Sequence, residues 1–282
     1  MLLIVYEHIS NFKRIPHPGP TLLLLLLAAC GKEEPPAGID LRPLWAPGLI
    51  VEVREERTVE QGRGPFPPAG EIAARSEKTE RILQHYREEV LEATGTDLRR
   101  TRRTYLRSLR RDGDRAENTI LDGRAYEIEA PFGDCRILTA GSALPLPPAE
   151  EALARAAVLR IAASLVPGTP VAVGQAWMPG RDPRRLLALG QTGVKMQARL
   201  AEVSDGPDGP VARVEAEAVV RTATQGQPVS FITRRETLRI DLAKRRFLSW
   251  EAVMEQHTDQ GAATPETWEK AVERAFFTWS TR

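Results

Sequence analysis

The segment YREEVLEATGTDLRRTRRTY, residues 86–105, allows two interpretations that lead to different folds. One is an amphipathic helix, because apolar residues recur at helical spacing: Ile82, Leu83, Tyr86 and Val90. The other is a hairpin with Thr94-Gly95-Thr96-Asp97 as a four-residue loop, which places Tyr86 opposite Tyr105. In that register, acidic residues face arginines in three pairs: Glu92–Arg99, Glu89–Arg102 and Glu88–Arg103. Antiparallel strands favour aromatic pairs and pairs of opposite charge, so the sequence predicts a hairpin.

The second arm of this hairpin is strongly basic, with seven arginines from Arg99 to Arg111. Such a run, interleaved with Tyr105, has the chemistry to bind phosphate groups of lipids or nucleic acid. The acidic arm beside it supplies matching charges, which favours a solvated sheet face instead. We therefore expect the arginines to be largely neutralised by their neighbours.

Further strands are expected on both sides of the hairpin. Upstream, Leu49, Val51 and Val53 occupy alternate positions in a segment that runs toward Val59. Downstream, residues 118–130 predict a strand, a tight Asp122-Gly123 turn and a second strand. Four more strands, separated by turn-forming segments, are predicted at residues 194–203, 211–222, 229–241 and 246–255.

Two helices complete the predicted fold. Residues 149–166 follow a proline-rich break and have acidic residues in the first turn. Residues 265–279 follow Thr264 as an N-cap and carry one apolar side, formed by Trp268, Val272, Ala275, Phe276 and Trp279. The predicted class is α+β, mainly antiparallel β: a curved sheet or half barrel with a central helix at 149–166 and a C-terminal helix at 265–279.

Near the amino terminus, a run of leucines and alanines ends at Cys30. The run is shorter than the about 20 apolar residues that span a bilayer. Lys13 and Arg14 precede it, as in a secretory signal peptide. The motif Leu27-Ala28-Ala29-Cys30 resembles the lipobox of bacterial lipoprotein signal peptides. The other interpretation, an ordinary buried thiol at the end of an apolar helix, stays open.

The lipobox resemblance implies that Cys30 is the site of lipid attachment. In that family the cysteine takes a diacylglycerol, the peptide is cut just before it, and the new amino terminus is commonly acylated as well, for example with palmitate. An aspartate after the cysteine usually retains such proteins at the inner membrane, and here the residue is Gly31. We therefore expect a protein of the cell envelope, anchored in the outer membrane and facing the periplasm.

These features divide the chain into a signal peptide at 1–29, a flexible tether at 30–48 and a β-rich envelope domain at 49–282. A further boundary near residues 145–148, which include three prolines, stays open. The chain has 39 basic and 38 acidic residues, and 37 of each remain without residues 1–29, which hold two basic residues and one acidic residue. A balanced charge gives no reason to expect a nucleic-acid partner. Cys135 is expected to be a small buried residue rather than a nucleophile.

The sequence contains no motif that predicts catalysis. It lacks a G-x-S-x-G elbow, an H-E-x-x-H pair, closely spaced His/Cys groups and a glycine-rich phosphate loop. We therefore predict no catalytic, metal or cofactor-binding residues and no cofactor, and we expect the protein not to be an enzyme. An envelope hydrolase with two carboxylates that meet only in space stays open as the least favoured alternative.

Two segments of the domain, Leu121–Ile128 and Val171–Trp177, resemble segments of uncharacterised bacterial lipoproteins. The expected arrangement of long antiparallel strands and a helix is also similar to half-barrel carriers of lipids and lipoproteins. That resemblance implies an apolar cavity between the sheet and its helices. The predicted function is a binding or assembly module for a lipid, another apolar ligand or an envelope protein. The alternative is a scaffold whose core is filled by its own side chains.

Overall fold

The structure is a computed structural model, and it describes residues 38–130, 135–141, 146–155, 158–179, 195–222, 229–259 and 266–281. Residues 37–282 form one compact unit, separate from residues 1–36. Cys30 and the predicted signal peptide lie outside the described ranges. Within those ranges, no helix combines the length and the apolar character that a membrane crossing requires.

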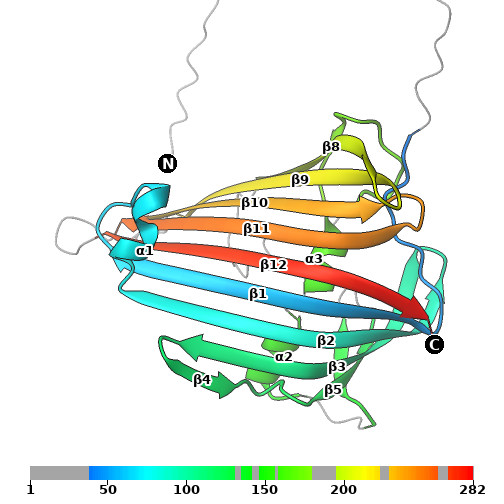
Figure 1. The fold of residues 1–282 in the computed structure, drawn as a ribbon, viewed down its shortest axis with the longest axis horizontal. Helices are drawn as coiled ribbons and strands as arrows, with labels where there is room; N and C mark the ends of the chain where they lie inside the picture. The colour runs from blue at the N-terminus through cyan, green and yellow to red at the C-terminus, as the bar shows by residue number, and fades with distance from the viewer. Residues whose placement is uncertain are drawn as a thin grey trace, which may run out of the picture. The chain divides into compact units, whose positions relative to one another are not determined.

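A single antiparallel sheet of twelve strands dominates the domain (Figure 1). The strands are β1 (Leu49–Arg63), β2 (Lys78–Thr94), β3 (Asp97–Asp112), β4 (Arg115–Asn118), β5 (Ala125–Glu129), β6 (Arg136–Thr139), β7 (Ala176–Trp177), β8 (Lys195–Gly206), β9 (Gly209–Thr222), β10 (Val229–Asp241), β11 (Arg246–Asp259) and β12 (Thr267–Thr281). Their order across the sheet is β6-β5-β3-β2-β1-β12-β11-β10-β9-β8-β7, with β4 paired to β3. The prediction of a mainly antiparallel β fold is confirmed, and the sheet is open rather than closed into a barrel.

Short helices accompany the sheet, and their positions distinguish its two faces. They are η1 (Ala69–Glu71), α1 (Ile72–Arg75), α2 (Pro148–Arg155) and α3 (Val158–Ser164). In Figure 1, α2 and α3 lie behind the strands, and α1 lies at the end of the sheet where β1 finishes. We call the face that carries α2 and α3 the inner face and the opposite one the outer face. The Arg103 guanidinium of β3 donates to the Ala154 carbonyl of α2 at 2.6 Å, which ties helix to sheet.

The predicted hairpin is formed by β2 and β3. Tyr86 pairs with Tyr105, and the pairs Glu88–Arg103 and Glu89–Arg102 form as expected. The third charged pair differs: Glu92 faces Arg100 rather than Arg99, because the register shifts on either side of Glu92. The loop is also shorter than expected, since Thr94 pairs with Asp97. Gly95 adopts φ 61°, a left-handed conformation that glycine tolerates without a Cβ clash.

The later strands follow their predicted positions closely. β10 has the predicted bounds, and β8, β9 and β11 extend the other three by a few residues at one end. The Asp122-Gly123 turn is present, with Gly123 at φ 70°. The strand before it, however, is the short β4, which pairs with β3 and not with β5.

The predicted C-terminal helix at 265–279 is wrong, because β12 runs through this segment between β1 and β11. The aromatic residues that suggested a helix lie on both faces of a strand: Trp268 and Phe276 on one face, Phe277 and Trp279 on the other. The predicted central helix at 149–166 is described as two shorter helices, α2 and α3, and residues 156–157 lie outside the description.

Residues 38–48, predicted as part of the tether, are packed into the domain. Leu41 and Trp45 are almost fully buried, and the rings of Trp45 and Trp279 lie 5.4 Å apart. Asp40 accepts a hydrogen bond from the Arg245 guanidinium at 2.8 Å. The tether can therefore extend no further than residue 37. The same sheet contains strands from before and after residues 145–148, so the boundary left open there does not separate two sheets.

Candidate functional site

The inner face changes character along the central strands. Alternate residues of β1 point to this face: Leu49, Val51, Val53, Glu55, Arg57, Val59 and Gln61. The change from apolar to polar begins at Glu55, and β12 repeats it: Trp279 and Phe277 lie level with Val51 and Val53, whereas Glu273 and Glu269 lie level with Arg57 and Gln61. We call the part level with Leu49 to Val53 the apolar half and the part level with Glu55 to Gln61 the polar half.

The apolar half is filled by the protein's own side chains. Val53, Tyr86 and Phe277 lie side by side on three neighbouring strands and are buried. The ring of Phe247 on β11 lies 6.0 Å from that of Phe277, and Leu159 of α3 belongs to the same core. Burying one large apolar side chain contributes about 1.5–3 kcal/mol. Side chains rather than a ligand therefore occupy this half.

A buried ion pair lies within the apolar half, level with Val51. The Arg103 guanidinium contacts the Glu88 carboxylate at 2.8 Å, and the two side chains are 3% and 2% exposed. Thr101 donates to the same carboxylate at 2.7 Å, and the guanidinium lies 5.1 Å from the centre of the Tyr86 ring. Burial alone would lower the pKa of Arg103, but the Glu88 charge and hydrogen bond, together with Tyr105 and Tyr86, outweigh it and the pKa is raised. Both members of the pair are thus well supplied with partners.

A second charged group crosses the polar half on β10, β12 and β1. Arg234 contacts Glu236 at 2.8 Å and Glu273 at 3.1 Å, and Arg57 reaches the other oxygen of Glu273 at 3.1 Å. The Trp250 indole also donates to Glu236, at 2.8 Å. Two guanidiniums and two carboxylates therefore neutralise one another on this part of the sheet.

Glu55, which also points to the inner face, differs from these ion-paired residues in its protonation. Burial, together with the negative charge of Glu273, raises its pKa to about 8, so the carboxyl is largely protonated at neutral pH. Its Oε2 atom is buried and has no hydrogen-bond partner among the described residues. The buried Tyr86 hydroxyl, which interacts electrostatically with Glu55, lacks a partner in the same way. The centre of the inner face thus contains polar groups whose hydrogen-bonding capacity the described protein does not use.

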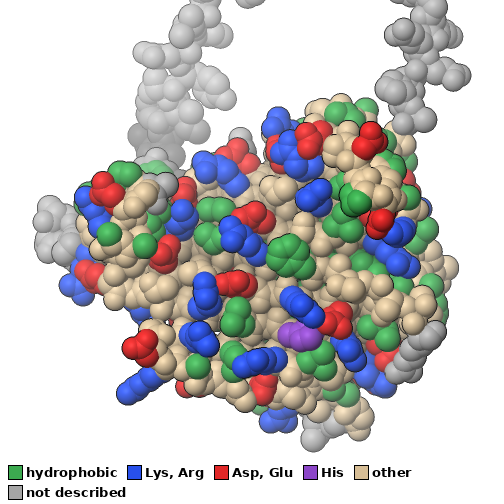
Figure 2. Space-filling model, in the orientation of Figure 1, with side chains coloured by type: hydrophobic (Ala, Val, Ile, Leu, Met, Phe, Trp, Pro, Cys, Tyr) green, Lys and Arg blue, Asp and Glu red, His purple; other side chains and the backbone are tan. Residues whose placement is uncertain are grey.

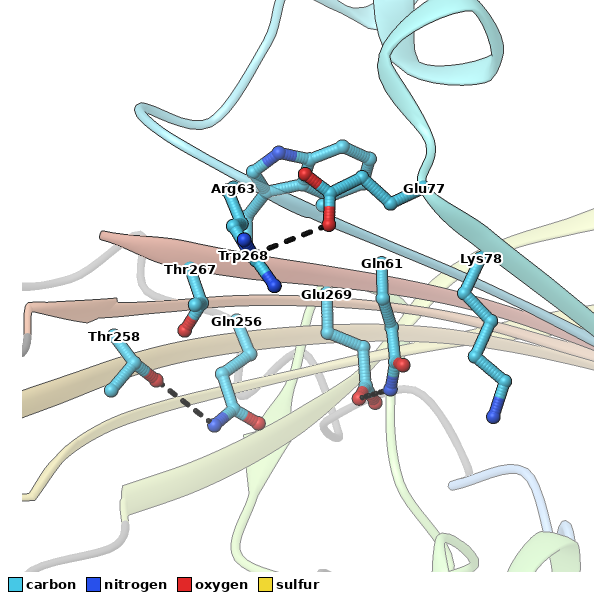
Figure 3. Close-up of a pocket in the computed structure, with 10 residues that line it drawn as sticks. Gln61, Arg63, Glu77, Lys78, Gln256, Thr258, Thr267, Trp268 and Glu269 are labelled. Atoms are coloured by element: carbon cyan, nitrogen blue, oxygen red, sulfur yellow. Dashed lines mark hydrogen bonds and ion pairs between the residues drawn. The ribbon is translucent and has the colours of Figure 1, made fainter. Parts of the chain in front are cut away.

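The polar half ends in a cavity of about 290 Å³ near α1, which we call the Gln61 cavity (Figure 3). Its lining consists of Gln61, Gly62, Arg63, Glu77, Lys78, Gln256, Thr258, Thr267, Trp268 and Glu269. Gln61 donates to Glu269 at 2.7 Å, and Gln256 donates to Thr258 at 3.3 Å. These hydrogen bonds fix both carboxamides in place along the wall of the cavity.

Strand register brings the cavity residues together from distant parts of the sequence. Gln61 of β1 pairs with both Lys78 of β2 and Glu269 of β12. Glu269 in turn pairs with Gln256 of β11, and Thr258 pairs with Thr267. Directly paired residues point to the same face, so one polar row crosses four strands.

Trp268 borders the cavity but lies on the other side of the strands, as Figure 3 shows. Its ring packs against Gly62 so closely that a Cβ on Gly62 would lie 2.5 Å from the ring, and Phe66 packs on it with ring centres 5.7 Å apart. Only 2% of Trp268 is exposed. It serves as a wall under α1 and offers no open ring face to a ligand.

The size and the lining of the Gln61 cavity indicate the kind of ligand that it suits. In the parts of the chain that the structure describes, no three His, Cys, Asp or Glu residues are grouped so as to hold a metal ion. The cavity volume lies at the lower end of the range of about 300–1,000 Å³ that small-molecule sites occupy. Its polar lining suits a compact polar ligand.

The arginines of β3 are matched by acidic neighbours, as the sequence suggested. Arg102 contacts Glu127 at 2.9 Å, and Arg110 contacts Glu80 at 2.8 Å. Figure 2 shows the outer face, where cationic and anionic side chains are interspersed rather than separated into patches. This face has the character of a solvated sheet surface.

Of the cysteines singled out in the sequence, Cys30 lies outside the described residues. Cys135 is 4% exposed, as expected, and its sulfur accepts a hydrogen bond from Arg155 at 3.1 Å. The cavity residues belong to no sequence motif. The one signal for these residues in the sequence is the shared polarity of positions that face each other at one end of β1, β11 and β12. That signal was lost because the segment of β12 is predicted as a helix.

No family model and no curated protein matches this sequence. Among solved structures, the chain is similar to one that describes lipid–protein interactions in lipovitellin. The TM-score is 0.44 and the identity 9%, and the match covers 84% of this chain and 26% of that chain. The chain thus spans about a quarter of that neighbour, and the similarity does not bear on what this chain binds.

Proposed function

We propose that this protein is a lipid-anchored envelope protein that binds a polar small molecule in the Gln61 cavity. The observation that carries the proposal is the cavity itself, which lies on the half of the inner face that apolar side chains do not fill. Its carboxamides are held on neighbouring strands by hydrogen bonds at 2.7 and 3.3 Å. Sites on paired strands are rigid, so little ordering opposes binding.

An acyl-chain carrier would need an apolar cavity. The apolar half is packed with the domain's own aromatic and aliphatic side chains, including Val53 and Phe277. A lipid therefore enters this proposal through its polar head group rather than its chains. The scaffold alternative, in which the filled core leaves no ligand, becomes one outcome of the binding experiment below.

The binding experiment compares the native protein with a variant whose cavity is filled. We expect mass spectrometry of the membrane-extracted protein to show a co-isolated polar compound, and we expect Gln61→Trp to lose it. Thr278→Trp, on the exposed outer side of β12, is the matched control and should retain it. A native protein with no bound compound, or one retained by Gln61→Trp, would support the scaffold instead.

The anchor is proposed from the lipobox at Leu27–Cys30. One acyl chain holds a protein only marginally, whereas two or three attach it stably at about 0.8 kcal/mol per buried methylene. Cys30→Ala should leave an uncut precursor without the acyl mass, while Cys135→Ala should be processed and lipidated normally. Unchanged cleavage and lipid labelling in Cys30→Ala would refute the anchor. With Gly31 after the cysteine, we expect the mature protein to fractionate with the outer membrane.

A further inference from the structure

We infer that the ligand of the Gln61 cavity is a neutral, hydroxyl-rich group, such as a saccharide ring, free or as the head group of a glycolipid. The inference rests on the proposed function and specifies the class of ligand. It follows from the charge balance of the lining, from the kinds of hydrogen-bonding groups present, and from their spacing.

The charges around the cavity are already matched. Arg63 contacts Glu77 at 3.4 Å. Lys78 lies 3.9 Å from both Glu80 and Asp112. The lining itself holds two cationic and two anionic side chains, because Glu269 adds one negative charge to that of Glu77. An incoming anion or cation would meet no excess of opposite charge to replace its hydration.

The remaining lining groups both donate and accept hydrogen bonds. A carboxamide has two N–H donors and a carbonyl acceptor, and a threonine hydroxyl does both. Gln61 uses one N–H on Glu269, and Gln256 uses one on Thr258, so each keeps an N–H and its oxygen for a ligand. A phosphate would leave the acceptors unpaired, and an ammonium group would leave the donors unpaired. A sugar hydroxyl matches both.

The spacing suits a ring that carries several hydroxyls. Gln61, Glu269 and Gln256 lie on three consecutive strands in direct register. Neighbouring strands are about 4.8 Å apart, so the two carboxamides are about 10 Å apart at the backbone, with the carboxylate between them. Because Trp268 offers no open ring face, hydrogen bonds must supply most of the affinity.

In the test, matched probes are titrated into the full lipidated protein, which is held in phosphatidylcholine nanodiscs. Ligand NMR measures the binding of each probe. Glucose and maltose are the neutral probes. Glucosamine adds one positive charge to the same skeleton, and glucose 6-phosphate adds a negative charge of about 1.5 to 2. We expect both neutral probes to bind and both charged analogues to bind at least tenfold more weakly. Octyl glucoside, below its micelle concentration, distinguishes a glycolipid head group from a free saccharide, because only the former gains affinity from its chain.

Two variants assign the binding to the cavity. Gln256→Leu removes a carboxamide of the lining and should weaken glucose binding at least tenfold. Thr278→Val, on the outer side of β12, should leave it unchanged. Unfolding curves for both variants show whether the fold is intact, and Gln256→Glu keeps the size of the side chain if the leucine variant fails to fold.

The outcomes separate this inference from the proposed function. If glucosamine or glucose 6-phosphate binds as well as glucose and Gln256→Leu abolishes that binding, the cavity is a site but the neutral-ligand inference is overturned. The same holds if the protein co-isolates with a charged compound that Gln61→Trp loses. If no probe binds and no compound co-isolates, both proposals fail.

Discussion

Two neighbouring glutamate–arginine pairs of the β2–β3 hairpin have the same chemistry and opposite surroundings. Glu88–Arg103 lies on the inner face with both side chains at most 3% exposed. In the next pair along the hairpin, Glu89–Arg102, the arginine is 43% exposed and contacts Glu127 on β5 at 2.9 Å. The sequence presents the two pairs identically, as glutamate opposite arginine. The face of the sheet therefore decides whether such a pair is part of the core or part of the solvated surface.

Two carboxyl groups of β1 show the same contrast. Glu55 on the inner face has its pKa raised to about 8, chiefly by burial. Glu52, three residues earlier and on the outer face, has its pKa lowered, chiefly by a hydrogen bond with His85 at 2.7 Å. Burial thus stabilises the neutral form of one carboxyl, and exposed partners stabilise the charged form of the other.

The largest expected effect comes from breaking the buried pair. Arg103→Leu leaves the Glu88 charge uncompensated in the core and removes the hydrogen bond to Ala154. We expect a loss of about 3–5 kcal/mol in the free energy of unfolding, measured by urea denaturation. Arg102→Leu is the matched control, with an expected loss of about 1 kcal/mol or less. Equal losses in the two variants would refute the distinction between the faces.

The next effect concerns pH. Glu55 titrates near 8 in the folded chain and near its ordinary value of 4.5 in the unfolded chain. Between these values the folded chain holds a proton that the unfolded chain has lost. This contribution to stability is therefore complete below about pH 4.5 and is lost as the pH rises to about 8. Its slope is at most about 1.4 kcal/mol per pH unit.

Glu55→Gln should remove this decline, since the amide resembles the protonated acid. The measurement is the free energy of unfolding of variant and wild type between pH 5 and pH 8, and their difference should shift in favour of the variant as the pH rises. Glu52→Gln gives the opposite control, for which the measurement is extended below pH 4.5. Glu52 stabilises the fold in its charged form, so its contribution should be lost as the pH falls below the ordinary glutamate range. Parallel curves for wild type and Glu55→Gln would contradict the assigned pKa.

The smallest effect belongs to the exposed pair. A double-mutant cycle with Glu89→Arg and Arg102→Glu should give a coupling of only about 0.2–1 kcal/mol, because solvent screens the pair and Arg102 also contacts Glu127. Thermal or urea unfolding of the four proteins measures it. A coupling of several kcal/mol would show that the outer face is less hydrated than its exposure indicates.

The sequence predicted much of the sheet, because strand register leaves a pattern in the residues that face each other. Tyr86 opposite Tyr105 and Glu88 opposite Arg103 identified the hairpin without a structure. The same reasoning failed for β12. Its inner face includes the charged Glu273, which a partner on β10 neutralises, and its outer face buries Trp268 under α1. Neither environment is visible along the strand itself, so the helical spacing of the apolar residues predicted a helix instead.

The Gln61 cavity could not have been predicted. Its residues come from β1, β2, β11 and β12, and Gln61 is 208 positions away from its hydrogen-bond partner Glu269. Glutamine and threonine are common at solvated strand ends, so their presence on one strand carries no signal. Only the order of the strands, which depends on pairing the first long strand with the last, makes them neighbours.

That pairing of β1 with β12 also constrains how the protein is made. β1 is synthesised first among the strands and β12 last, yet they lie together in the middle of the sheet. Until the final residues emerge, β1 and β11 each have an unpaired backbone edge, and such edges promote aggregation. If the chain is exported as proposed, a holding chaperone has to protect these edges until translocation ends. A product truncated before residue 267 would be left as two half-sheets with no common centre.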